Sequence, residues 1–166
     1  MKDLIVKNLV GSRILILFFL TGLIYTIMLT VTIPMVMSHS GGLKILDLMP
    51  TGYDYTYVKS LLDALGEKGR NIYLYRQIPL DLLFPSLLGI TFCLIFAYFL
   101  RYLNKLDSKW YYLVFLPLLA GLFDYLENTG FISLLISYPV IPEWLVILSN
   151  IFSILKSSFS TLFYTT

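Results

Sequence analysis

Cysteine and histidine are almost absent from this sequence, which has one of each, Cys93 and His39, in 166 residues. A single cysteine excludes an internal disulfide or a Cys-x-x-Cys redox pair. One histidine cannot build a multi-histidine metal centre. No Gly-x-Ser-x-Gly or Walker A segment occurs, so the most recognisable hydrolase and nucleotide-binding signatures are missing. We therefore expect no metal site and no cofactor.

Charged residues are also scarce. They make up 13% of the chain, whereas a soluble domain averages about 25%. Hydrophobic residues make up 58%, and the mean hydropathy is +0.81. This leaves too little polar surface to coat a water-exposed globule, so the composition predicts an integral membrane protein. The net charge of +2 gives no indication of a nucleic-acid partner.

Four apolar runs are long enough to cross a membrane, because a hydrocarbon core about 30 Å thick takes roughly 20 helical residues. They cover residues 14–37, 78–100, 110–137 and 144–166. The first run has 24 residues, longer than the roughly 7 to 15 of a signal peptide, and is therefore interpreted as an uncleaved helix. We expect an all-α integral membrane protein, a four-transmembrane-helix bundle that forms one domain over residues 1–166.

The distribution of Lys and Arg predicts the orientation, since short loops rich in these residues stay cytoplasmic. One side would carry six cations and the other five, and five acidic residues balance the cations of the second side. The six are Lys2, Lys7, Arg13, Arg101, Lys105 and Lys109. Both termini are therefore expected in the cytoplasm. The expected partners are membrane lipids, with a homo-oligomer or a partner membrane protein left open.

Residues 38–76 form the one sizeable predicted loop, on the extracytoplasmic side between the first two membrane helices. Its first part, SHSGGLKILDLMPTGYD, is rich in turn-forming residues and should be irregular. Apolar residues then recur at helical spacing from Tyr57 to Leu65. Asp54 can cap this stretch and Gly66 can end it. We expect a short amphipathic helix that acts as a lid on the bundle.

Several polar residues interrupt the apolar runs. At about 1.5 Å per residue, Asp124 lies about 22 Å from Lys109, the inner end of its helix. The same arithmetic puts the others at a similar height, in the outer third of the bilayer. They are Asp81, Asp124, Glu127, Asn128 and Asn150. An Asp facing lipid costs roughly 2.5–3.5 kcal/mol. These groups should therefore face one interior pocket, whereas Lys156 is expected to extend toward the cytoplasmic surface.

Arginines just outside the second run are the expected partners of these carboxylates. Arg70 shares a helical face with Tyr73, Gln77 and Asp81, and Arg76 is close to it. Three carboxylates near two guanidinium groups leave one negative group in excess. The predicted ligand-binding residues are Arg70, Tyr73, Arg76, Asp81, Asp124, Glu127, Asn128 and Asn150.

Two segments together resemble a family of small, uncharacterised four-helix membrane proteins, mostly from prokaryotes. The segments are LDALGEKGRNIYLYRQIPLDLLFP, residues 62–85, and GLFDYLEN, residues 121–128. They contain Gly-x-x-Gly-Arg-x-x-Tyr, then an Asp and Phe-Pro, and finally Asp-x-x-Glu-Asn. The resemblance implies the four-helix fold, a shared site at these positions and a prokaryotic plasma (inner) membrane. It implies no known activity.

Three functional interpretations stay open at the level of sequence. The favoured one is binding of a polar small molecule, ion or lipid headgroup in the carboxylate and arginine pocket. A second is a structural or partner-binding tetraspan protein, in which the polar cluster only locks the fold, because buried polar networks can specify one packing arrangement. The third is an intramembrane acid/base enzyme acting on a lipid. It is the least favoured, since no nucleophile or metal set accompanies the carboxylates.

Overall fold

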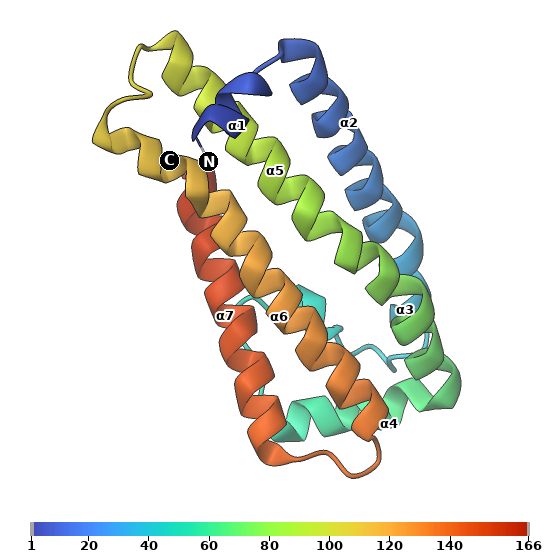
Figure 1. Ribbon diagram of the computed structural model, residues 1–166. Coiled ribbons are helices and arrows are strands. Elements are labelled where there is room, and N and C mark those ends of the chain that lie inside the picture. The colour runs from blue at the N-terminus through green and yellow to red at the C-terminus, as the bar shows by residue number, and fades with distance from the viewer. Residues whose placement is uncertain (1, 166) are drawn as a thin grey trace.

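The computed structural model describes residues 2–165, a chain of helices joined by turns with no strand in that range. The long helices run side by side, and α1 and the C-terminal end of α7 lie toward the same end of the molecule (Figure 1). The elements are α1 (Lys2–Lys7), α2 (Gly11–Ile27), η1 (Met28–Thr32), α3 (Ile33–Met37), η2 (Leu46–Leu48), α4 (Tyr55–Ile72), η3 (Tyr73–Gln77), α5 (Ile78–Tyr102), η4 (Lys109–Phe115), α6 (Leu116–Ser137) and α7 (Glu143–Tyr164).

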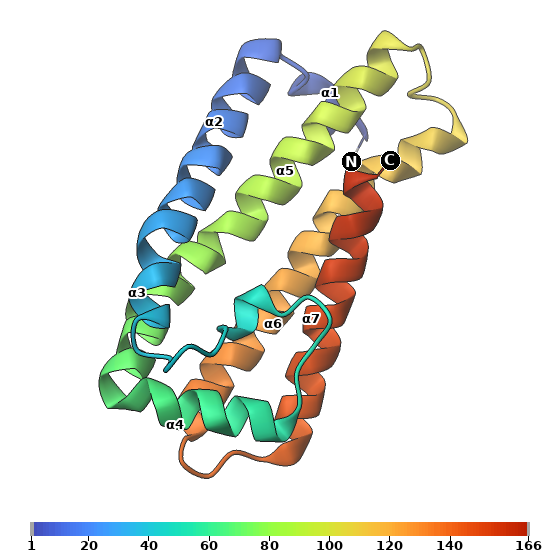
Figure 2. The same ribbon diagram turned by 180° about the vertical axis from the view of Figure 1, so that it is seen from behind.

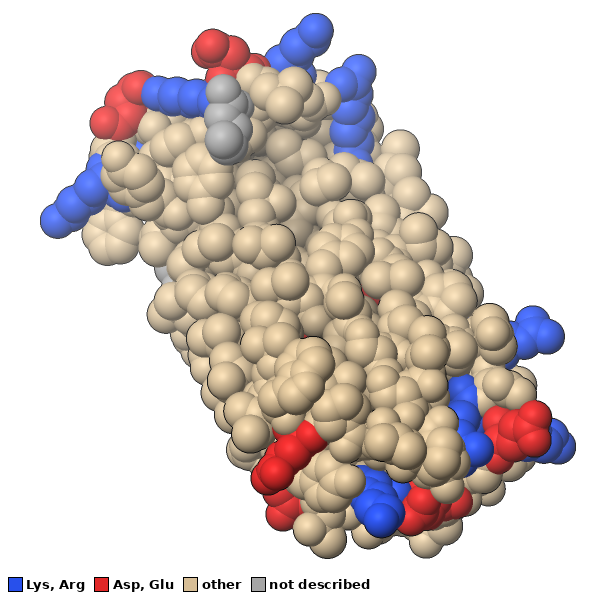
Figure 3. Space-filling model, turned by 60° about the horizontal axis from the view of Figure 1, so that its bottom comes forward, with Lys and Arg blue, Asp and Glu red and all other residues tan. Residues whose placement is uncertain are grey.

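Three helical runs are long and apolar enough to span a membrane: Gly11–Met37, Tyr55–Tyr102 and Glu143–Tyr164. This agrees with the predicted membrane class. The space-filling view supports it, because on this face Lys, Arg, Asp and Glu gather at the two ends and leave a long middle that is almost free of charge (Figure 3). The fourth expected run, 110–137, is divided between η4 and α6, and α6 is not among the three. Residues 1 and 166, the ends of the predicted single domain, lie outside the described chain.

The long helices pack in the order α2, α5, α6, α7. Helix α6 contacts both α5 and α7 extensively, whereas α2 packs mainly on α5. As a result, α2 and α7 lie on opposite edges of the bundle (Figures 1 and 2). Figure 2 shows segment 38–54, which includes η2, crossing the space between these edges near one end. The polar groups of the interior lie beneath this segment.

Close contact between α5 and α6 depends on Gly121. A Cβ atom at Gly121 would lie 2.9 Å from the backbone oxygen of Pro85, which cannot move without shifting α5. We expect Gly121→Ala to lower the free energy of unfolding by about 1–3 kcal/mol through overpacking. In α2, a Cβ at Gly22 meets nothing within 4 Å. Gly22→Ala should therefore be neutral or stabilise by up to about 1 kcal/mol.

The stability of the Gly121→Ala and Gly22→Ala variants can be measured through the sole cysteine, Cys93. Cys93 is 5% exposed, so a thiol-reactive fluorescent maleimide labels it only as the protein unfolds. The melting curve of each variant in mild detergent then reports its stability. Equal melting temperatures for the two glycine variants would contradict the tight α5–α6 contact.

Helix α4 covers the end of the bundle, lying across the long helices (Figures 1 and 2). Asp54 caps it by accepting a hydrogen bond from the Tyr57 backbone N–H at 2.7 Å, as expected. Gly66 interrupts the helix with φ +59°, as its predicted role as a terminator requires. The apolar face of the first part, made of Val58, Leu61, Leu62 and Leu65, is buried. These features confirm the amphipathic helix.

Beyond Gly66 the chain stays helical through η3 and Pro79 into α5. Tyr73, Gln77 and Asp81 consequently share one face at a spacing of four residues, and all three are buried. This face points into the bundle beneath segment 38–54. The predicted common face of Tyr73, Gln77 and Asp81 is therefore confirmed.

Candidate functional site

Lys156 of α7 joins two carboxylates of α6. Its Nζ lies 2.8 Å from Asp124 Oδ1 and 2.5 Å from Glu127 Oε2. Both carboxylate side chains are 4% exposed, whereas the Lys156 side chain is 22% exposed. The prediction that Lys156 extends to the cytoplasmic surface is wrong, because two buried carboxylates one helical turn apart attract its ammonium group more strongly than a distant interface.

Asn128 connects this ion pair to α5. Its Nδ2 donates to the Asp124 carboxylate and to the backbone oxygen of Asp81, both at 3.2 Å. Two buried atoms here keep no hydrogen-bond partner within residues 2–165, Asn128 Oδ1 and Asp81 Oδ2. An unpartnered buried polar atom costs about 1–3 kcal/mol. Asp81 is only 2% exposed, so bulk water does not compensate for this cost.

Asp47, in η2, is a site residue that sequence reasoning missed. Its carboxylate accepts hydrogen bonds from the Tyr73 hydroxyl and from Gln77 Nε2, the latter at 3.2 Å. The Gln77 side chain in turn accepts from the Thr32 hydroxyl. A signal was present in the sequence, since two apolar residues lie on each side of Asp47 in an otherwise turn-rich loop. They are Ile45, Leu46, Leu48 and Met49. Such a pattern indicates a segment that dips into the core.

Segment 38–54 is attached to α7 by Tyr53. The Tyr53 hydroxyl lies 2.7 Å from Ser149 Oγ and 3.1 Å from Ser153 Oγ, and its backbone N–H donates to Asn150 Oδ1 at 3.0 Å. Burial raises the pKa of Tyr53 to about 12, so the hydroxyl keeps its proton at neutral pH. Gly52 has φ +95°, and a Cβ there would lie 2.3 Å from Asn150 Oδ1. Asn150 thus anchors the segment and does not face the carboxylates.

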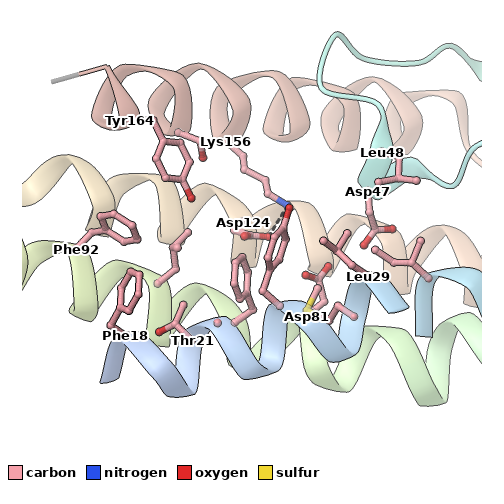
Figure 4. A pocket seen from close by; sticks show the side chains of 17 residues that line it. Phe18, Thr21, Leu29, Asp47, Leu48, Asp81, Phe92, Asp124, Lys156 and Tyr164 are labelled. Atoms are coloured by element: carbon pink, nitrogen blue, oxygen red, sulfur yellow. Dashed lines mark ion pairs between the residues drawn. The ribbon is translucent and has the colours of Figure 1, made fainter. Parts of the chain in front are cut away.

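A cavity of about 480 Å³ opens beside the carboxylates. Figure 4 looks into it: α7 carries Lys156 and Tyr164 on one side, α2 carries Phe18 and Thr21 on the other, and Asp47 enters from η2. Most of the lining is apolar or aromatic, and its charged residues are Asp47, Asp81, Asp124 and Lys156. No group of three side chains suited to a metal ion occurs in the described part of the chain.

The two predicted arginines lie elsewhere. Arg70 donates to the Leu62 backbone oxygen at 2.7 Å, and its guanidinium lies 3.8 Å from the ring centre of Tyr138. Arg76 is exposed and lines a shallow surface hollow with Glu67 and Lys68. The expectation that these arginines neutralise the buried carboxylates is therefore wrong. The η3 turn directs Arg76 outward, and the Tyr138 ring holds Arg70 at the rim.

The other predicted site residues occupy the interior in different ways. Asp81 and Asp124 line the cavity. Three further residues do not line it but contact its charged groups: Glu127 forms an ion pair with Lys156, Asn128 donates a hydrogen bond to Asp124, and Tyr73 donates one to Asp47. Asp47 and Lys156 complete the set of charged groups, in which Lys156 forms ion pairs with two of the four carboxyl groups, those of Asp124 and Glu127, and not with Asp47 or Asp81. The geometry suits a ligand that donates hydrogen bonds or carries positive charge.

Comparison with protein-family models, with curated proteins and with solved structures gave no match. The resemblance to small four-helix prokaryotic membrane proteins therefore stays a prediction.

Proposed function

We propose that this chain is an integral membrane protein of the prokaryotic plasma membrane that binds a small polar molecule or a lipid headgroup in the cavity between α2 and α7. In this proposal α2–α3, α5, α6 and α7 cross the bilayer. Both termini face the cytoplasm, and segment 38–54 with α4 lies on the outer side. The charged ends and nearly uncharged middle of the molecule support this arrangement (Figure 3).

One observation carries the binding function: the Asp81 side chain lines the cavity, and its buried Oδ2 receives no hydrogen bond from a donor within residues 2–165. A cluster that only locks the helices together should satisfy its own groups, as Lys156 does for Asp124 and Glu127. Asp81 departs from this pattern, because its side chain lines the cavity but its buried Oδ2 receives no hydrogen bond from a donor within residues 2–165. A ligand donor at this position would complete the network.

The test compares the molecules that remain bound to the purified protein. We expect mass spectrometry of extracts from the wild type in mild detergent to find a bound species. Asp81→Asn should reduce it about tenfold or more, because a hydrogen bond to a charged group contributes about 1.5–3 kcal/mol and 1.4 kcal/mol is a factor of ten. Glu67→Gln removes an exposed carboxyl outside this cavity and is the matched control.

One result would contradict the proposed binding function. If the wild type, Asp81→Asn and Glu67→Gln contain the same molecules in the same amounts, the cavity holds no specific ligand. The carboxylates would then serve only to fix the packing of the helices. Melting curves recorded through Cys93 establish that all three proteins are folded before their contents are compared.

A further inference from the structure

The cavity is long as well as polar. Asp81 and Phe92 of α5 both line it, and eleven residues of helix separate them by about 16 Å. This is about half of a hydrocarbon core roughly 30 Å thick, the depth that the chain of one lipid leaflet occupies. Asp47 and Asp81 lie at the end beneath η2, and aromatic residues, Phe18, Phe92 and Tyr164, lie at the other end (Figure 4).

The cavity opens to the side of the bundle. Phe18 and Tyr25 of α2 line it and are each 48% exposed. Gly22, between them, leaves open space where a Cβ would stand. In the proposed membrane arrangement this opening faces lipid chains and not water. A ligand with an apolar chain can therefore enter between α2 and α7 without leaving the bilayer.

The acidic groups at one end of the cavity, Asp47 and Asp81, form no ion pair within residues 2–165. Lys156 is engaged by Asp124 and Glu127. Asp47 is held by two neutral donors, and its carboxyl group lies within hydrogen-bonding reach of the Asp81 carboxyl group. The charge of Lys156 also acts on Asp81, but no donor group within residues 2–165 contacts Asp81 Oδ2. Figure 4 shows both carboxyl groups at this end of the cavity. They match a ligand ammonium group, which forms strong charge-assisted hydrogen bonds with such acceptors.

An aromatic pair strengthens this match. Tyr25 and Phe84 line the cavity beside the charged end, and their rings stack with centres 5.4 Å apart. Aromatic faces attract organic cations when the charge lies within about 6 Å of the ring centre. They also pack against the first carbon atoms of an apolar chain. An alkylammonium group therefore suits both the carboxyl groups and their surroundings.

We infer that the ligand is a membrane amphiphile with an ammonium headgroup, which places the headgroup between Asp47 and Asp81 and its apolar chain along α5 toward Phe92. This inference rests on the proposed function and names the class of molecule bound. The headgroup lies toward the outer side and the chain toward the membrane centre, as in a lipid of the outer leaflet. Asp47, which reaches this position from η2, makes segment 38–54 a part of the binding site.

The test uses three probes of stated chemistry with the purified full chain in nonionic detergent. Dodecylamine has both the ammonium group and the chain, ethylamine has only the ammonium group, and dodecanol has the chain without the charge. Binding is measured by native mass spectrometry over a range of probe concentrations. We expect dodecylamine to bind at least about tenfold more tightly than either of the other probes, since 1.4 kcal/mol of extra binding energy is a factor of ten.

Two variants test separately how the headgroup and the apolar chain of the ligand contribute to binding. Asp81→Asn should weaken dodecylamine binding about tenfold or more, through loss of the charged acceptor. Gly22→Phe, which places a ring at the side opening, should remove the advantage of dodecylamine over ethylamine. Gly11→Phe is its matched control, since Gly11 also has open space at its Cβ position but does not line the cavity.

Each contrary outcome has a distinct meaning. Equal binding of dodecylamine and dodecanol would contradict the inference that the ligand has an ammonium headgroup. Equal binding of dodecylamine and ethylamine would contradict the inference that it has an apolar chain. Failure of all three probes would overturn the amphiphile altogether. In every one of these cases the proposed function still holds if a species bound to the wild type is lost in Asp81→Asn. If no such species exists, the proposed function itself fails.

Discussion

Replacing Lys156 by methionine is expected to lower the free energy of unfolding by about 3–5 kcal/mol. The change removes the ammonium group that contacts Asp124 and Glu127 and leaves two carboxylates that are each 4% exposed. Methionine has a similar length and an apolar chain, so lost packing contributes little. Melting curves recorded through Cys93 measure the effect, and we expect a large fall in melting temperature.

A triple variant shows whether the charge is responsible. Lys156→Met combined with Asp124→Asn and Glu127→Gln removes all three charges and keeps the size of the side chains, so it should recover most of the lost stability. Lys2→Met provides a surface comparison. Its partner Asp107 is 92% exposed, so the loss should be no more than about 1 kcal/mol. A triple variant as unstable as Lys156→Met alone would show that the ion pair is not what holds α6 to α7.

Phe131→Ala is expected to cost about 3–5 kcal/mol by leaving a cavity in the core. Phe131 of α6 is completely buried, and its ring centre lies 6.3 Å from those of both Tyr53 and Tyr73. It therefore supports segment 38–54 and η3 together. The same substitution at Phe19, which is 67% exposed on α2, should change stability by less than about 0.5 kcal/mol.

Proteolysis distinguishes local loosening from general destabilisation in Phe131→Ala. Loss of the contact with Tyr53 should make segment 38–54 susceptible to protease at temperatures where α5, α6 and α7 stay folded. Cleavage within this segment should increase in Phe131→Ala and not in Phe19→Ala. If both variants are cleaved at the same rate as the wild type, the ring is not what fixes the segment over the bundle.

Composition and hydrophobic periodicity were sufficient for the helical class and for most helix boundaries. A chain with 13% charged residues cannot coat a soluble globule, and runs of about 20 apolar residues fit a bilayer whatever their neighbours are. The Asp54 cap and the break at Gly66 were also predictable, because capping depends on groups a few residues apart. The burial of Asp81 and Asp124 followed from the cost of exposing a carboxylate to lipid.

The partners of the carboxylates depended on tertiary structure. The sequence placed Arg70 and Arg76 near Asp81, yet distance along a helix does not decide which side chain turns inward. The ring of Tyr138, just after α6, holds the Arg70 guanidinium at the rim. Helix α7 brings Lys156 between two carboxylates of α6. Both contacts join segments far apart in the chain, which periodicity within one helix cannot relate.

Composition and hydrophobic patterning were enough to predict that this protein is helical and apolar, and that the acidic groups within its apolar runs are buried. Which of these acidic groups receive hydrogen bonds or form ion pairs depended on how distant segments pack together, and the tertiary fold set these contacts. It did so by folding η2 into the bundle, which brings Asp47 to the cavity, and by leaving Asp81 Oδ2 without a partner in the described chain. The physical reason is that hydrogen bonds and ion pairs act over a few ångströms in space, and only packing sets those distances.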